Sequence, residues 1–181
     1  MPTITAIPTA LSSTGLEPDI ARKRCFEPVV DERTRLLILG SLPGEQSLLR
    51  NEYYAHAQNR FWRLLSDVME IDLPSLDYPA RLQALLANGI GLWDVVAQAT
   101  RAGSLDSRIR DRCDNDLPAL IGRLPNLAAI AFNGATATRI GLKVLGAQAS
   151  SYQILTLPSS SPAYTLAYAE KLLLWQVLRP C

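Results

Sequence analysis

The chain has 181 residues, 48% of them hydrophobic, so it can bury one sizeable core and is too short to favour two domains. Eighteen Lys and Arg residues face 17 Asp and Glu residues, and this balance neither indicates nor excludes a polyanionic partner. Three widely spaced cysteines and a single histidine exclude a zinc site and a four-cysteine iron–sulfur cluster, so we expect no metal and no cofactor.

The cysteine usage and the apolar runs also bear on location. Isolated cysteines without a CxxC pair are typical of a reducing compartment, which predicts a cytoplasmic protein. No apolar run approaches the ~20 residues of a membrane span, and no signal peptide is recognisable, so we expect no membrane contact. Fifteen of the 18 basic residues are Arg, which suits phosphate contact but also follows from a GC-rich genome.

The N-terminal segment predicts little packing. Residues 1–24 are rich in Thr, Ser, Pro and Ala and end in Arg22-Lys23-Arg24, so we expect a mobile tail that closes with a solvated basic turn. The single folded domain is then expected to span residues 25–181, beginning near Cys25.

The rest of the chain alternates between short apolar runs and helical patterns. Buried strands are predicted at residues 36–39, 90–96, 127–132 and 152–157. Helices are predicted at residues 59–70, 78–87, 116–123, about 135–144 and 163–178, with an Arg-rich loop and short helix at 100–112. Strands separated by helices predict an α/β fold with a four-stranded parallel sheet covered on both faces.

Three of the predicted strands run into helices through small residues, at 40–44, 133–134 and 159–162. Helix N-termini after parallel strands attract anions, so this sheet edge predicts an anionic ligand. The first loop lacks the GxxxxGK[ST] pattern of nucleoside triphosphatases and the GxGxxG pattern of dinucleotide enzymes. A serine hydrolase is disfavoured because there is no GxSxG motif and His56 precedes the serine-rich loop.

Two polar sites have both a structural and a functional interpretation. Ser161-Pro162 could cap the last helix, and the three serines 159–161 could also grip a sugar-phosphate backbone. Asn59 stands just before a helical pattern and could simply be its N-cap.

The motifs at these loops resemble a known family. The segments are LGSLPG at 39–44, YYAHAQNRFW at 53–62, GLWDVV at 91–96, GSLDS at 103–107, FNG at 132–134 and LPSSSPA at 157–163. Together they resemble the uracil-DNA glycosylase superfamily, and within it the hypoxanthine (deoxyinosine) DNA glycosylase branch. The mismatch-specific uracil-DNA glycosylases are similar but more distant.

The resemblance implies a fold and an activity. It implies a three-layer α/β/α sandwich around the parallel sheet, and a monofunctional DNA glycosylase of base-excision repair that hydrolyses the N-glycosidic bond of hypoxanthine, with uracil or xanthine possible. The partner would be damaged DNA, from which the nucleotide is flipped into a cavity, and we expect a monomer. No Lys lies in a candidate active-site loop, so strand scission through a Schiff base is not expected.

The resemblance also implies site residues. Leu42 stands where the mismatch-specific enzymes place an Asn, so the positioning of the attacking water shifts to Asn59, with His56 or the loop amides stabilising the leaving base. His56 has an equally plain structural interpretation, and Glu45 or Glu52 is a reserve general base. The expected base pocket consists of Gly40, Ser41, Leu42, Pro43, Gly44, Tyr53, Tyr54, Phe61 and Asn133, although Phe61 also fits a buried helix face. The expected DNA-backbone contacts are Ser159, Ser160, Ser161 and Pro162.

Two alternatives remain open. A relative that binds nucleic acid but has lost the chemistry with the polar residue at position 42 would bind duplex without turnover. A nucleoside enzyme would act on free inosine without competition from DNA.

Overall fold

The computed structural model describes residues 22–179. Its centre is a four-stranded parallel sheet in the order β3-β2-β6-β7. The strands are β2 (Leu36–Gly40), β3 (Ile90–Asp94), β6 (Ala129–Asn133) and β7 (Gln153–Leu157). The predicted α/β class and parallel sheet are therefore confirmed.

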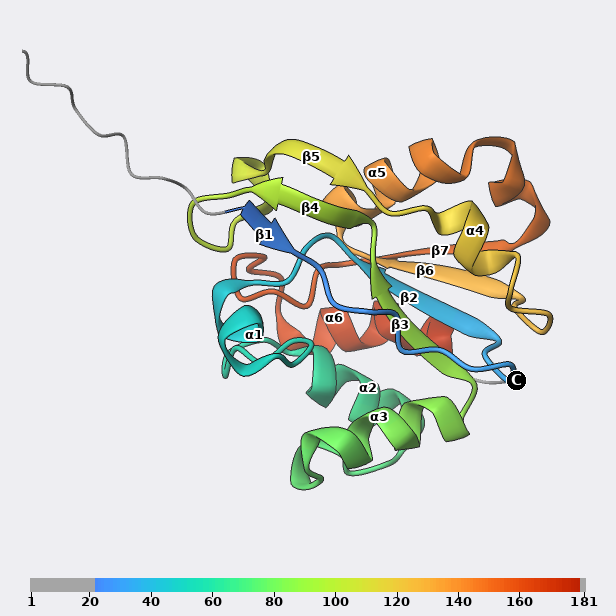
Figure 1. Cartoon of the computed structure of the whole chain (residues 1–181). Coiled ribbons are helices and arrows are strands. Elements are labelled where there is room, and N and C mark those ends of the chain that lie inside the picture. Colours follow the sequence, from blue (N-terminus) through green and yellow to red (C-terminus); the bar gives the residue numbers. More distant parts are fainter. Residues whose placement is uncertain (1–21, 180–181) are drawn as a thin grey trace, which may run out of the picture.

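Helices cover both faces of this sheet, as Figure 1 shows. One face carries α2 (Phe61–Met69), α3 (Tyr78–Ala87) and α6 (Tyr168–Trp175), and the other carries α4 (Leu117–Ile121) and α5 (Ala135–Leu145). Because side chains alternate along a strand, Leu37 and Leu39 of β2 enter the core under α4 and α5, while Ile38 enters the core under α2, α3 and α6. The three-layer arrangement is confirmed.

A second, antiparallel sheet was not predicted. It has the order β1-β4-β5 and consists of β1 (Arg22–Arg24), β4 (Val96–Thr100) and β5 (Arg110–Asp114). The expected basic turn at Arg22-Lys23-Arg24 is thus wrong, because these residues pair with β4. The expected strand at 90–96 is divided, since the backbone leaves the parallel sheet after Asp94 and Val96 already pairs with Asp114.

The last helix also differs from expectation. It begins at Tyr168 rather than near residue 163, so Ser161 and Pro162 lie in a turn and do not cap it. A short helix, α1 (Glu45–Arg50), follows the first loop and was not expected. Short 3₁₀ helices occupy η1 (Leu73–Ser75), η2 (Asp106–Arg108), η3 (Gly146–Ser151) and η4 (Gln176–Leu178).

Two further expectations concern the N-terminal tail and membrane-spanning segments. Of the tail predicted for residues 1–24, residues 1–21 lie outside the described residues. Within residues 22–179, no helix has both the length and the apolar character needed to cross a membrane.

Candidate active site

A cavity of about 880 Å³ opens at the carboxyl ends of the parallel strands. Figure 1 shows the loops after β2 and β7 side by side at this end of the sheet. Four segments line the cavity: the loop and helix 40–47, the aromatic segment 53–59, the hairpin tip 104–107 and the serine loop 159–164. The structure therefore brings together the three motif-bearing loops on which the sequence interpretation depends.

The first loop, residues 40–44, is held by a buried cation. Arg101, only 1% exposed, donates hydrogen bonds to the carbonyls of Leu42 (3.1 Å) and Pro43 and to that of Gly103 (3.1 Å). These bonds tie the loop to the end of β4. Leu42 itself is buried in the core under α4 and α5, so an apolar residue at this position serves packing and leaves the loop backbone to face the cavity.

Asp94 ends β3 and lines the cavity with a buried carboxylate. The residue is 4% exposed, and its Oδ2 has no hydrogen-bond partner among residues 22–179. Burial, reinforced by the negative charge of Asp106 and opposed by Arg101, raises the pKa of Asp94 to about 7. An unpartnered polar atom of this kind is costly, which marks it as a functional candidate.

Gly40 makes room for this carboxylate. A Cβ at Gly40 would lie 2.6 Å from Asp94 Oδ1 and 2.9 Å from the Tyr54 hydroxyl. The hydroxyl of Tyr54 is also buried and without a partner among the described residues. The Asp94 carboxylate and the Tyr54 hydroxyl therefore both lie close to the position that a side chain at residue 40 would occupy.

Asp106, at the tip of the hairpin β4–β5, also lines the cavity. It accepts a hydrogen bond from the Ser41 hydroxyl at 2.7 Å, and one of its oxygens lies 3.7 Å from Arg101 Nη1. Burial raises the pKa of Asp106, while Ser41 and Arg101 oppose that rise. This carboxylate is committed to holding Ser41, unlike that of Asp94.

The ring of Tyr54 is held in place by stacking on another aromatic ring. Its ring stacks on Phe61 with 3.6 Å between centroids and 12° between planes, and Phe61 is fully buried against Trp62 and Trp175. Tyr54 has φ +55°, a conformation that side chains rarely adopt and that is retained mainly at functional sites. Phe61 thus supports the Tyr54 ring and does not line the cavity, so of its two expected positions the buried helix face is the one observed and the base contact is wrong.

Tyr53 also differs from its expected role. It is 3% exposed, donates its hydroxyl hydrogen to the carbonyl of Glu27 (3.3 Å), and packs edge-on against Phe26. Its ring belongs mainly to the core, although the residue borders the cavity.

Asn59 and His56 both lie on the cavity wall. Asn59 Oδ1 accepts from the backbone N–H of Phe61 (3.0 Å), the first residue of α2, so the side chain does satisfy the helix end. This bond leaves the Nδ2 hydrogens and the second lone pair of Oδ1 available. His56 is exposed, and its Nδ1 accepts from the N–H of Gln58 (3.2 Å).

The serine loop is held by two hydrogen bonds to a buried side chain. Asn133, at the end of β6, donates to the Ser160 hydroxyl and accepts from the Ser160 N–H, both at 2.9 Å. Asn133 lines the cavity, but these two bonds make it chiefly a support for the loop. No Lys lies within an active-site loop in the sequence, but Lys171 reaches the serine loop from α6 and donates to the Ser161 carbonyl at 3.2 Å.

Sequence reasoning missed Asp94, Arg101 and Asp106. Asp94 and Asp106 stand inside motifs that were recognised, yet neither was assigned a role. The available signal was an acidic residue at the carboxyl end of a buried strand, where ligands of parallel sheets bind. Glu45, the reserve base, lies at the rim, is exposed, and pairs with Lys23 at 3.1 Å.

The comparisons with known proteins agree with this geometry. The family model for the Uracil DNA glycosylase superfamily matches residues 27–179. A hypoxanthine DNA glycosylase from Methanosarcina barkeri is 47% identical over 113 residues, which cover 62% of this chain and 72% of the relative. One from Methanosarcina acetivorans is 41% identical over 141 residues, covering 78% and 87%.

A solved structure also matches. It is a solution NMR structure of a Methanosarcina acetivorans protein described as a candidate uracil DNA glycosylase. The TM-score is 0.78 at 37% identity, covering 87% of this chain and 96% of that one. The match to the family model over most of the described residues, with the motif-bearing loops gathered around one cavity, places the chain in the uracil DNA glycosylase superfamily.

Proposed function

We propose that the protein is a monofunctional DNA glycosylase that hydrolyses the N-glycosidic bond of hypoxanthine in DNA. The family, the activity named for two relatives and the cavity at the sheet edge support this proposal. A base inside a duplex cannot reach such a cavity, so the enzyme must flip the nucleotide out of the stack.

The observation that carries the choice of base is the Asp94 carboxylate, which belongs to the cavity lining and has one oxygen without a partner among residues 22–179. Hypoxanthine has a hydrogen on N1, which an ionised carboxylate accepts. Adenine has a lone pair at N1, which the same carboxylate repels. A site that hydrogen-bonds one group discriminates strongly against the analogue lacking it, so Asp94 separates deaminated purines from the abundant adenine.

The Tyr54 ring supplies a face for the flipped base. One face is covered by Phe61, and the residue borders the cavity. Stacking on an aromatic ring is worth about 1–3 kcal/mol per base and tolerates different bases. Stacking therefore provides affinity, while the Asp94 carboxylate provides selectivity.

Asn59 is the residue that positions the water. Bond cleavage builds positive charge on the sugar and negative charge on the departing base. The free lone pair of Asn59 Oδ1 can accept a hydrogen from water and aim its oxygen at the sugar carbon C1′. His56 and the backbone N–H groups of Ser41, Leu42 and Gly44 belong to residues that line the same cavity and can stabilise the negative base.

The test is cleavage of a duplex that carries one deoxyinosine, followed by alkali to break the abasic site. We expect wild type to cleave this strand, and Asn59→Ala to slow the single-turnover rate about 100- to 1,000-fold, as for the loss of one preorganised hydrogen-bonding group. The same assay is carried out on duplexes that contain one uracil or one xanthine, and on free deoxyinosine. If the protein binds duplex but cleaves none of these substrates, the proposed activity is contradicted and a non-catalytic relative is favoured. If it cleaves free deoxyinosine and DNA does not inhibit that cleavage, a nucleoside enzyme is favoured.

Asn59→Asp separates the two functions of this side chain. A carboxylate still accepts from the Phe61 N–H, so this variant keeps the stability that Asn59→Ala loses, about 1 kcal/mol. If Asn59→Ala stays folded under the assay conditions despite this loss, its slow cleavage reports on water positioning and not on unfolding. An unchanged rate in Asn59→Ala contradicts the role of Asn59.

The monofunctional character, the cytoplasmic location and a monomeric state belong to the same proposal. Lys171 is the lysine that reaches the serine loop, and it is 3% exposed with its ammonium bound to the Ser161 carbonyl. This setting supports an abasic-site product without a Schiff base. Scission without alkali would contradict it.

A further inference from the structure

A second, smaller cavity of about 350 Å³ lies behind the serine loop. Pro162 and Tyr164 line both this cavity and the active-site cavity, so the two are separated only by the turn after Ser161. The remaining lining includes two cations, Arg60 and Lys171.

Lys171 is an unusual buried cation. It is 3% exposed, its Nζ donates to the Ser161 carbonyl (3.2 Å), and it lies 5.3 Å from the centroid of the Tyr164 ring. An ammonium has three donors, and one is used in this bond. Within residues 22–179, no carboxylate forms an ion pair with Lys171.

Arg60 adds a second positive charge from the N-terminal end of α2. Burial, followed by the charge of Arg60, lowers the pKa of Lys171. The side chain of Arg60 is exposed and likewise has no ion pair in the described part of the chain. Two cations that repel each other across a polar cavity are a destabilising arrangement, and a bound anion would relieve it.

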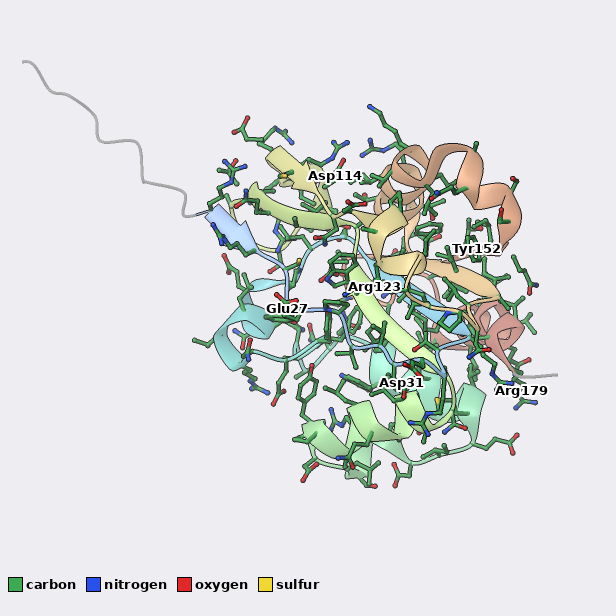
Figure 2. All side chains as sticks on the ribbon, turned by 45° about the vertical axis from the view of Figure 1, so that its right-hand side comes forward. Glu27, Asp31, Asp114, Arg123, Tyr152 and Arg179 are labelled. Carbon is green, nitrogen blue, oxygen red and sulfur yellow. The ribbon has the colours of Figure 1, made fainter. Side chains whose placement is uncertain are left out.

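The anion follows from the position of the cavity. The backbone N–H of Arg60 donates to the Ser160 carbonyl (3.0 Å), so this cation pair is fastened to the loop beside the active-site cavity. Figure 2 labels acidic residues (Asp31, Asp114) and basic residues (Arg123, Arg179) on the side of the molecule that it shows. The chain carries 18 Lys and Arg against 17 Asp and Glu, so its net charge attracts DNA little and local cation sites matter more.

We propose that Arg60 and Lys171 form a binding site for one phosphodiester of the strand that carries the flipped nucleotide. The proposal rests on the proposed function, because a DNA strand entering the active-site cavity passes the serine loop. Arg60 contacts the phosphate oxygens, and Lys171 supplies charge from the floor of the cavity. The contact positions the strand and carries no base preference.

The first experiment measures the affinity of full-length protein for deoxyinosine and undamaged duplexes as a function of salt. Arg60→Ala and Lys171→Met should each weaken binding to both duplexes by a similar factor and reduce the slope of log K against log salt by about 1. Lys171→Arg, which keeps the charge, should restore the slope. Arg139→Ala and Lys143→Ala, on exposed positions of α5 in the opposite layer, are matched controls and should leave the slope unchanged.

The second experiment locates the phosphate. A set of duplexes, each with one neutral methylphosphonate near the deoxyinosine, should reveal a flanking position where wild type loses affinity. Arg60→Ala should lose no further affinity there, because the two changes remove the same interaction. Full sensitivity of Arg60→Ala at every position, or unchanged salt slopes in folded Arg60→Ala and Lys171→Met, overturns the phosphate site.

These outcomes are separable from failure of the activity. A wild type that binds duplex with the expected slope but cleaves no deoxyinosine refutes the proposed activity and leaves the phosphate site supported. A wild type that binds no duplex refutes both.

Discussion

At the scale of single residues, the ionisation of Asp94 affects both the recognition of the base and the free energy of unfolding. Its carboxyl group is buried, and its pKa is raised from 3.8 to about 7 by burial and Asp106 against the opposing charge of Arg101. Ionisation of Asp94 at neutral pH therefore costs folding free energy. A hydrogen bond from N1 of hypoxanthine would offset that cost in the complex.

This linkage predicts a pH-dependent effect of Asp94→Asn. Between about pH 4 and pH 7 the folded state keeps a proton that the unfolded state has lost, so wild-type stability falls as pH rises through this interval. Asn does not titrate, so the free energy of unfolding of the variant, relative to that of wild type, should rise by up to about 4 kcal/mol between pH 4 and pH 8. Urea denaturation at several pH values measures the difference.

The comparison is repeated with Asp106→Asn present in both proteins, because burial also raises the pKa of Asp106 and its charge raises that of Asp94. The pKa values of Cys25, Tyr53 and Tyr54 are raised as well, from values already above this interval, and those groups do not titrate within it. A difference between Asp94→Asn and wild type that is constant with pH would show that Asp94 is ionised in both states.

Single residues also show how far sequence reasoning reaches. Asn59 and the first loop were predicted because they stand in motifs with a known order, and the structure places them on one cavity wall. Tyr53 and Phe61 were expected to line the base pocket, but an aromatic residue next to another gives no sign of which ring faces the core. Asp94 was missed because burial of a carboxylate depends on neighbours from three distant segments.

At the scale of elements, the hairpin β4–β5 and the first loop form one unit through Arg101. The guanidinium binds two carbonyls of the loop and one of the hairpin, and lies 3.7 Å from Asp106. Lys23 of β1 adds a bond to the Gly103 carbonyl at 2.6 Å. The antiparallel sheet thereby positions the wall of the active-site cavity.

Arg101→Met should therefore damage both stability and activity. In this variant three carbonyls lose a charged donor and Asp106 loses the nearby guanidinium, so we expect a loss of about 3–5 kcal/mol in the free energy of unfolding. Arg101→Lys should recover little, because an ammonium cannot reproduce the fork of donors. Chemical denaturation and single-turnover cleavage measure the two effects, and a fully active, stable Arg101→Lys enzyme would contradict this view of the loop.

The antiparallel sheet escaped prediction for a physical reason. β1 and β5 have the sequences RKR and RDRCD, which show no apolar alternation because most of their side chains are exposed. The division between β3 and β4 falls at Val95, in a segment where apolar residues stand on both sides of Asp94. Such a segment cannot reveal that its end pairs with a different sheet.

At the scale of the whole molecule, the parallel sheet was predictable because its strands are short apolar runs between helical patterns. Its carboxyl edge then gathers loops that are up to about 120 residues apart in the chain, which is the general property of parallel sheets. The late start of α6 was not predictable, since Ser161-Pro162 is a good helix start by local rules but here forms a turn beside the second cavity.

The central claim is that this cavity excises hypoxanthine and rejects adenine through Asp94. The most direct measurement compares single-turnover rate constants on duplexes with one deoxyinosine or one test deoxyadenosine, for wild type and Asp94→Asn. We expect wild type to excise only hypoxanthine, and Asp94→Asn to lower the ratio of the two rates at least tenfold, because an amide can donate to N1 of adenine. An unchanged ratio, or no excision of hypoxanthine by wild type, would contradict the account.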